Sequence, residues 1–394
     1  MLVRNLVIAV MHLVIAAALA AVAATCVQGI LGDALHAARA ETLQTYIRMR
    51  GDREQAVFDR AETFILAAES AFVRRLETLS DEEVEAEFDR FFPPHGDGTR
   101  RSAPDLFDGA DLGGGDHTYG VGAFLGDGEA MTLEEKRRYL AGLHVVRTVG
   151  EAWLQQFSSL YYFTPDRRMV MFAPEREDRL EFYRYEAPAD FPLQADEDPR
   201  LFSRETNPDG VMQCTQLSRF VYRDAGERSA TACRKPVLKG NVLLGAFGTS
   251  IMMNDHLARA LEEPPAGGVN LMLGRELQVI ARGSPAAEGD DVRVDPAALA
   301  GYLADDPRPR GIVRAEALGQ MIAFSRVAGP DWYFVSVVPL ADIEATVSER
   351  TRRVFLIVFF AALVVSALAS LVWHYLPALR LPGRPAARTE ATPE

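Results

Sequence analysis

The residues best suited to nucleophilic chemistry lie in segment 248–252, which reads GTSIM. This segment comes close to the Gly-x-Ser-x-Gly motif, in which a serine sits on a sharp turn between a strand and a helix. Met252 occupies the place of the second glycine that such a turn needs, and His256 is the nearest candidate base. A serine hydrolase built on Ser250 is therefore the least favoured function, and we predict that the chain is not an enzyme.

Metal-binding chemistry finds little support in the sequence. The 7 histidines are scattered, and none of them pairs with another at the spacing of zinc ligands. The glycine-rich region 95–130 carries several aspartates, but their spacing does not match the alternating acidic positions of a calcium-binding EF-hand loop. The sequence therefore predicts neither a metal site nor a cofactor.

Both ends of the chain carry an apolar run long enough to span a membrane. Residues 6–31 contain no charged side chain and exceed the roughly 20 residues that a transmembrane helix needs. A cleaved signal peptide would have a shorter apolar core, so an uncleaved anchor is favoured. Residues 354–376 form the second predicted span, and we expect residues 1–5 and a short disordered tail, 377–394, to be cytoplasmic.

The long segment between the two spans is strongly acidic. The whole chain has a net charge of -13, and Arg4 and a tail of net charge +1 leave about -15 on this segment. Nucleic-acid binding needs clustered lysines and arginines, so a nucleic-acid partner is excluded. We expect a bacterial inner-membrane protein with its large domain in the periplasm.

Two cysteines of this segment, Cys214 and Cys233, lie 19 positions apart in a region with strand character. Their spacing leaves two interpretations open, a disulfide and two free buried thiols. Export to an oxidising compartment favours the disulfide.

The first part of the segment reads as helical. Apolar residues recur three and four positions apart and predict a long spine helix, which Gly51 interrupts in one interpretation. Capping boxes at 80–83 and 132–135 open two further helices, the second reaching Phe157. Between these two helices, the glycine-rich and aspartate-rich region 95–130 predicts a loop.

The remainder of the segment has the pattern of antiparallel sheets. A proline- and glycine-rich boundary at 263–268 separates two sets of strands. Before it we predict strands over 160–163, 168–172, 180–185, 217–222, 229–237 and 242–251, followed by a helix that Asn254 caps. After it we predict strands over 269–273, 276–281, 311–315, 321–327 and 332–340, a helix over 295–303, and a helix from 341 into the second span.

Three stretches carry a resemblance to a known family. They are 220–224 (FVYRD), 231–248 (TACRKPVLKGNVLLGAFG) and 329–340 (GPDWYFVSVVPL). Their order between two spans resembles the double Cache sensor family. The resemblance implies an α+β fold: a long helical region over 32–92, a membrane-distal PAS-like antiparallel-sheet module over 93–263, a membrane-proximal one over 264–353, and flanking transmembrane helices.

Members of that family bind small molecules in the distal module, and the resemblance implies a ligand site in this one. The candidate ligand-binding residues are Tyr162, Arg179, Tyr183, Tyr222, Asp224 and Ser250. Ser250 stands where the amino-acid-binding branch of the family keeps an aspartate. A hydroxyl does not replace the charge-assisted bond between a carboxylate and an ammonium group. We therefore expect a ligand other than a free amino acid.

The function predicted from the sequence is a membrane-anchored periplasmic sensor of a small molecule. Its transmembrane helices would pass the signal to a separate partner protein, with a homodimer as one form of the sensor. A scaffold of the cell envelope that senses nothing is the main alternative, and an empty, well-packed distal core would favour it.

Overall fold

The computed structural model describes residues 2–113, 116–193, 199–222, 226–284 and 292–375. This part of the chain is α+β, as the sequence predicts. It divides into two compact units, a larger one over Leu43–Val338 and a smaller one formed by the chain up to Thr42 and from Pro339 onward.

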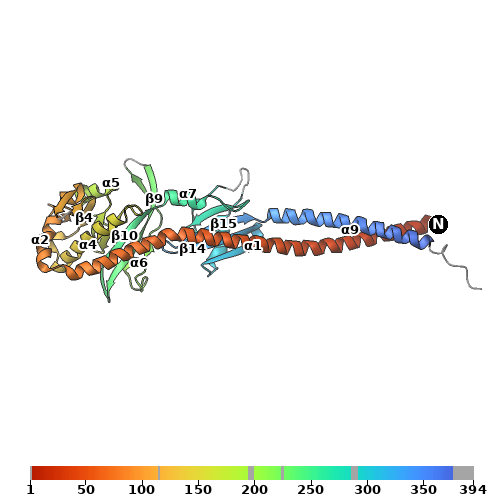
Figure 1. Ribbon diagram of the computed structural model, residues 1–394, viewed down its shortest axis with the longest axis horizontal. Coiled ribbons are helices and arrows are strands. Elements are labelled where there is room, and N and C mark those ends of the chain that lie inside the picture. Colours follow the sequence, from red (N-terminus) through yellow and green to blue (C-terminus); the bar gives the residue numbers. More distant parts are fainter. Residues whose placement is uncertain (1, 114–115, 194–198, 223–225, 285–291, 376–394) are drawn as a thin grey trace, which may run out of the picture. The chain divides into compact units, whose positions relative to one another are not determined.

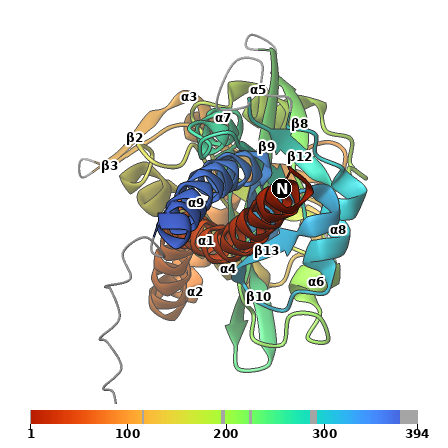
Figure 2. The same ribbon diagram turned by 90° about the vertical axis from the view of Figure 1, so that its right-hand side faces the viewer.

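The smaller unit contains two helices that are long and apolar enough to cross a membrane. They are the first part of α1 (Leu2–Thr78) and α9 (Ala341–Tyr375), which lie side by side (Figures 1 and 2). Small buried side chains on α1, Ala16 and Ala20, permit close packing, and Ser370 Oγ lies 3.2 Å from His12 Nε2.

In the larger unit, the remainder of α1 forms the predicted spine. Its apolar face is fully buried along several turns, by Phe58, Ala61, Phe64, Ile65, Ala68 and Phe72. Gly51 does not interrupt the helix. It is buried at a place where a Cβ would overlap the side chain of Ser325, so the backbone of α1 approaches the second sheet closely there.

The first module is built on an eight-stranded sheet in the order β1-β4-β6-β5-β10-β9-β7, with β8 also paired to β9. All these pairings are antiparallel. The strands are β1 (Arg100–Arg101), β4 (Val121–Leu125), β5 (Leu160–Thr164), β6 (Arg168–Phe172), β7 (Gln213–Cys214), β8 (Ser218–Tyr222), β9 (Gly226–Lys239) and β10 (Val242–Met252). A separate two-stranded ribbon pairs β2 (Ala110–Gly113) with β3 (Asp116–Thr118).

The first module also contains six helices in the part of the chain that the structure describes. They are α2 (Asp81–Phe91), α3 (Pro104–Asp108), α4 (Leu133–Ala152), α5 (Glu177–Glu181), α6 (Pro199–Phe202) and α7 (Asn254–Leu261), with short turns η1 (Gly128–Ala130) and η2 (Phe182–Glu186). The spine and α4 pack on one face of the sheet. There Phe72 meets the ring of Tyr162 at 4.8 Å between centroids, and a Cβ at Gly142 of α4 would lie 2.7 Å from the same ring.

The second module is a five-stranded sheet in the order β12-β11-β15-β14-β13. Its elements are β11 (Val269–Leu273), β12 (Val279–Arg282), α8 (Pro296–Ala304), β13 (Arg310–Ala315), η3 (Glu316–Leu318), β14 (Gln320–Val327) and β15 (Trp332–Pro339). Leu299 and Leu303 of α8 bury their side chains in the core of this module, and Figure 2 shows α8 beside the sheet. Asp295 caps α8 through its carboxylate, as the Asp-Pro start predicts.

The spine helix contacts both modules. Phe58 packs edge-on against Trp332 of β15 at 6.0 Å and against His256 of α7 at 6.4 Å. Arg50 donates to the carbonyl oxygens of Ala260 and Glu262 at 2.6 and 3.2 Å, which satisfies the C-terminal end of α7.

Two segments differ from the sequence-based expectation. Region 95–130 is not a loop, because β4 runs through it as a fully buried strand between β1 and β6. The short apolar run of β4, which glycines and aspartates flank in the sequence, is typical of a strand buried on both faces. The predicted strand over 180–185 is instead helical, formed by α5 and the π-helical turn η2.

The predicted cap of α7 is also wrong. The helix begins at Asn254 without a side-chain cap, and Asn254 Oδ1 accepts a hydrogen bond from the backbone N–H of Ser229 at 2.6 Å. The asparagine therefore joins the start of α7 to β9. In the second module, β12 begins at Val279, because Gly274 to Gln278 form a hydrogen-bonded turn.

Glu135 stabilises the N-terminus of α4 in a pH-dependent way. Its carboxylate accepts from the N–H of Thr132 at 2.7 Å and from Arg168 at 2.7 Å. Partial burial raises the pKa of Glu135, but these hydrogen bonds outweigh it and lower the pKa from 4.5 to about 2. The stabilisation is therefore present above pH 4.5 and is lost as the pH falls towards 2.

Substituting Glu135→Gln is expected to lower the free energy of unfolding by about 1 kcal/mol at neutral pH. Chemical unfolding measured from pH 7 to pH 2 should show this difference shrinking below pH 4.5. Glu134→Gln, at the neighbouring exposed position, is the control and should change little. A difference between wild type and Glu135→Gln that stays constant down to pH 2 would contradict the assignment.

Candidate functional site

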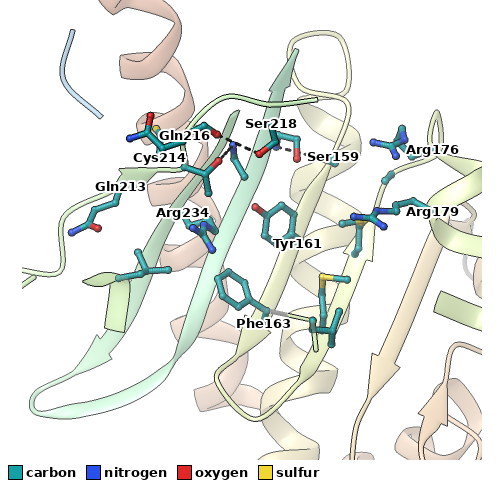
Figure 3. Close-up of a pocket in the computed structure, with 18 of the residues that line it drawn as sticks. Ser159, Tyr161, Phe163, Arg176, Arg179, Gln213, Cys214, Gln216, Ser218 and Arg234 are labelled. Carbon is teal, nitrogen blue, oxygen red and sulfur yellow. Dashed lines mark hydrogen bonds between the residues drawn. The ribbon is translucent and has the colours of Figure 1, made fainter. Parts of the chain in front are cut away.

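The face of the first sheet opposite the spine helix borders a cavity of about 710 Å³. Strands β5, β6, β9 and β10 form its floor, and Figure 3 shows their side chains directed into it. The volume lies within the range of small-molecule sites. The floor residues are Ser159, Tyr161, Phe163, Met169, Met171, Ala232, Arg234, Ser250 and Met252.

Gly248 shapes the middle of the floor. It is paired across the sheet with Tyr161 on one side and Arg234 on the other. A Cβ at this position would lie 2.6 Å from the ring of Tyr161 and 2.7 Å from Cγ of Arg234. The missing side chain therefore leaves room over β10 for the Tyr161 ring and the aliphatic part of Arg234.

Arg234 brings a positive charge into the floor. Its side chain is 3% exposed, and its guanidinium lies 6.0 Å from the centroid of the Phe163 ring. Burying a charge is costly, and groups that balance it must lie close to it. A guanidinium in this position favours an anionic group in the adjacent cavity.

The segment α5–η2 closes one side of the cavity and adds two further arginines. Arg176 donates to both carboxylate oxygens of Asp178 at 3.0 and 3.2 Å, and Arg179 lies over the ring of Tyr183 at 5.5 Å. Burial raises the pKa of Asp178, but the hydrogen bonds and charge of Arg176 and the charge of Arg179 outweigh it and hold the pKa below its usual value. Two arginines of this wall thus lie beside one carboxylate.

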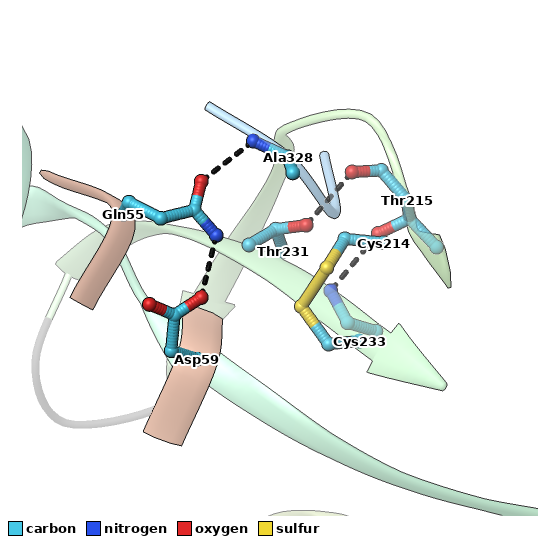
Figure 4. Close-up of a disulfide and its surroundings, with 8 residues drawn as sticks. Gln55, Asp59, Cys214, Thr215, Thr231, Cys233 and Ala328 are labelled. Carbon is cyan, nitrogen blue, oxygen red and sulfur yellow. Dashed lines mark hydrogen bonds between the residues drawn. A yellow bond between two sulfur atoms is a disulfide. The ribbon is translucent and has the colours of Figure 1, made fainter. Parts of the chain in front are cut away.

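The opposite wall is the segment from Gln213 to Ser218, fixed by a disulfide. Cys214 of β7 is bonded to Cys233 of β9, and the two residues face each other across the sheet (Figure 4). Thr231 Oγ1 also donates to the carbonyl oxygen of Thr215 at 2.7 Å. The disulfide predicted from the sequence is confirmed, and it holds the cavity wall in place.

The lining is cationic although the protein is acidic. Four arginines line the cavity, Arg176, Arg179, Arg234 and Arg275, whereas Glu276 is the one acidic side chain among the described residues that line it. The whole chain has a net charge of -13, so these arginines act locally and not through the overall field. The cavity is chemically suited to a small anion.

The structure brings together three of the residues predicted from the sequence. Arg179, Tyr183 and Ser250 all line the cavity. Tyr162 lies on the other face of β5, fully buried, and its hydroxyl donates to the carbonyl oxygen of Leu244. Tyr222 ends β8, and Asp224 lies outside the described residues.

The structure adds Tyr161, Arg176 and Arg234 to the candidate site. Alternation along β5 gives a signal for Tyr161, since consecutive tyrosines of a strand must point to opposite faces. Arg234 stands within a predicted strand, where an inward-facing charge is unusual. Neither signal says which face of the sheet borders a cavity.

The exclusion of free amino acids depends on Ser250, and the site does not support it. Ser250 is an uncharged residue of the cavity lining, and its backbone N–H donates to Ser159 Oγ at 3.3 Å. The lack of a carboxylate at this one position does not exclude an ammonium group elsewhere in the cavity. Glu276, which reaches the same cavity from the second module, is a carboxylate that can accept from an ammonium group.

Ser250 and His256 also line a second cavity of about 570 Å³, together with Glu54. His256 Nε2 lies 3.1 Å from Glu54 Oε2, and no hydrogen bond joins Ser250 to His256 in the described chain. A nucleophilic serine needs a base within hydrogen-bond reach. The arrangement therefore does not form a catalytic pair. Among the described residues, no cluster of three or more metal-ligating acidic, His or Cys side chains occurs.

No family model matches the chain, and no curated protein matches it in sequence. Solved structures do. The chain is similar to the ligand-binding domain of the Pseudomonas aeruginosa amino acid chemoreceptor PctC in complex with GABA, with 12% identity over 76% of this chain and 99% of that one and a TM-score of 0.38. The sensory domain of the Campylobacter jejuni chemoreceptor Tlp3 with isoleucine bound gives 10% identity, 80% and 97% coverage, and a TM-score of 0.41.

A third similar structure is the ligand-binding domain of the Pseudomonas fluorescens chemoreceptor CtaA with L-isoleucine, with 14% identity over 53% of this chain and 79% of that one and a TM-score of 0.30. These neighbours are sensory domains of chemoreceptors. Identities and TM-scores this low transfer no ligand and no site residue to this chain.

Gly248→Ala tests the shape of the floor. The added Cβ must displace Tyr161 and Arg234, and we expect the free energy of unfolding to fall by about 1–3 kcal/mol. Gly301→Ala is the matched control, because nothing lies within 4 Å of a Cβ at that position of α8. It should stabilise the protein by about 0.5–1 kcal/mol. Equal stability of the two variants in thermal unfolding would show that the floor is not tightly packed.

The disulfide is tested by the double variant Cys214→Ser with Cys233→Ser. It opens a loop of 19 positions, for which the chain-entropy relation gives about 3 kcal/mol, so the Tm should fall by several degrees. A reducing agent should lower the Tm of the wild type to that of the double variant and leave the double variant unchanged. Cys26→Ser, which removes the free cysteine of α1, is the control.

Proposed function

We propose that this protein is a membrane-anchored sensor that binds a small organic anion in the cavity of its first module. The sensing region faces the periplasm of a bacterium, anchored in the inner membrane. Binding is passed through the two transmembrane helices to a separate signalling partner.

One observation carries this proposal: a cavity of ligand size whose walls bring arginines from two directions. Arg234 lies in the floor, and Arg176 and Arg179 lie in the wall formed by α5. Arginine forms paired hydrogen bonds with carboxylates and phosphates, and its planar charge suits such anions. Apolar side chains at the edge of the cavity, such as Phe191 and Leu201, would contact the carbon skeleton of the anion.

The same observation weighs against a scaffold that senses nothing. A scaffold gains nothing from a hollow lined with buried charge, since filling it with apolar side chains would stabilise the protein. The retained cavity therefore supports a binding function over a purely structural one.

A thermal-shift screen of the full-length chain in detergent tests the proposal. The compounds are organic acids, amino acids, sugars and amines. A ligand at one hundred times its Kd adds about 2.7 kcal/mol, so an organic acid should raise the Tm by several degrees. Higher ionic strength should weaken the effect, because salt screens charge pairs.

Arg179→Gln should abolish most of this shift, because it removes a half-buried cation from the cavity wall. Arg90→Gln is the matched control, since Arg90 is exposed on α2 and lines neither the first nor the second cavity. Stabilisation only by amines or sugars, or an unchanged shift in Arg179→Gln, would refute an anion sensor. No stabilisation by any compound would favour the scaffold.

A further inference from the structure

The β11–β12 turn of the second module reaches the ligand cavity of the first. Arg275 and Glu276, at the tip of the turn, line the same cavity as Arg179 and Arg234. We propose that the ligand is a di- or tricarboxylate held between the two modules, with one acidic group bound by Arg275. This inference rests on the proposed function and identifies the ligand class and a second set of contacts.

The turn is built to hold its tip in place. The N–H of Gly274 donates to the carbonyl oxygen of Gln278 at 2.8 Å, and the N–H of Leu277 donates to that of Gly274 at 2.9 Å. The Gln278 side chain also accepts from the N–H of Glu276 at 3.1 Å. Leu277 adopts a left-handed conformation with φ of 60°, which a non-glycine residue tolerates only where its surroundings fix it. Arg275 is thus presented by a preorganised backbone.

The guanidinium of Arg275 keeps binding capacity for a ligand. Its Nε lies 3.7 Å from Asp331 Oδ2, too far for a hydrogen bond, and its side chain is 27% exposed. Asp331 is held more closely by Arg326, whose Nε donates to Oδ1 at 2.5 Å. Two arginines share the carboxylate of Asp331, as Arg176 and Arg179 share that of Asp178.

This arrangement determines the chemistry of the ligand. One set of cations, Arg176, Arg179 and Arg234, belongs to the first module, and Arg275 belongs to the second. A monocarboxylate satisfies one set, whereas a ligand with two or three carboxylates contacts both. The carboxylate of Glu276, next to Arg275, repels the acidic group that Arg275 binds and so lowers the affinity for the ligand.

The location of Arg275 gives the ligand a direct effect on the second sheet. The turn follows β11, which is paired with β15 from Val269–Val337 to Leu273–Tyr333, and the chain continues from β15 into α9. A ligand that pulls on Arg275 therefore acts on the strand pair that precedes the second transmembrane helix. For a signal to result, the ligand must bind the two states of this junction with different affinity.

Calorimetric titration of the full-length chain in nanodiscs with succinate and with citrate tests the inference. Arg275→Gln should weaken the binding of at least one of these anions about tenfold to a hundredfold, the effect of losing a charged hydrogen bond. Glu276→Gln should tighten it about twofold to fivefold by removing a like charge. Arg314→Gln, which removes the same charge from β13 and lines none of the described cavities, should leave it unchanged.

Hydrogen exchange gives an independent readout. Citrate or succinate should slow the exchange of amides in 274–278 in the wild type and not in Arg275→Gln. Binding that Arg179→Gln abolishes and Arg275→Gln leaves intact would overturn this inference and leave the proposed anion sensor standing. Failure of the wild type to bind either anion would overturn the assignment of a di- or tricarboxylate ligand; an organic acid found by the thermal-shift screen would still support the sensor.

Discussion

Burial of one face of α1 is the contact on which the rest of the larger unit depends. Phe72 and Phe64 pack into the first module, against Phe247 and Phe157, and Phe58 packs against Trp332 of the second. Each fully buried phenylalanine contributes about 1.5–3 kcal/mol, so both sheets draw stability from the same helix. The opposite face of the first sheet is then left to border a cavity.

The first sheet separates two environments, and β5 shows how. Tyr162 points to the helical side, where it is fully buried among rings, and Tyr161 points to the cavity. Close packing on the helical face holds the sheet in place, so the cavity on the other face does not need side chains to fill it. The arginines around the hollow are placed by α5, by β9 and by the turn after β11, so their relative positions depend on tertiary structure and not on local sequence.

This dependence explains what the sequence could predict. Strong periodicity and capping boxes predicted α1, α2 and α4, and strand-forming runs bounded by turn signals predicted β5, β6, β9 and β10, because these signals are local. β4 was missed because its five buried residues lie among turn-forming residues. Segment 180–185 was assigned to a strand because a short run of apolar and aromatic residues fits a strand as well as a helix. Arg179, Tyr183 and Ser250 were found through the resemblance, whereas Arg234 and Arg275 needed the fold that brings β9 and the second module to one cavity.

The backbone of Cys214 joins the two modules. Its N–H donates to the carbonyl oxygen of Gly329, in the turn before β15, at 3.1 Å, next to the hydrogen bond from Ala328 to Gln55 of the spine (Figure 4). At position 214 only proline removes the donor, whereas Gly329, which supplies the acceptor, has a φ of 89°, a left-handed conformation that any other residue would strain. This link between the modules therefore depends on glycine at position 329 and not on the side chain at position 214.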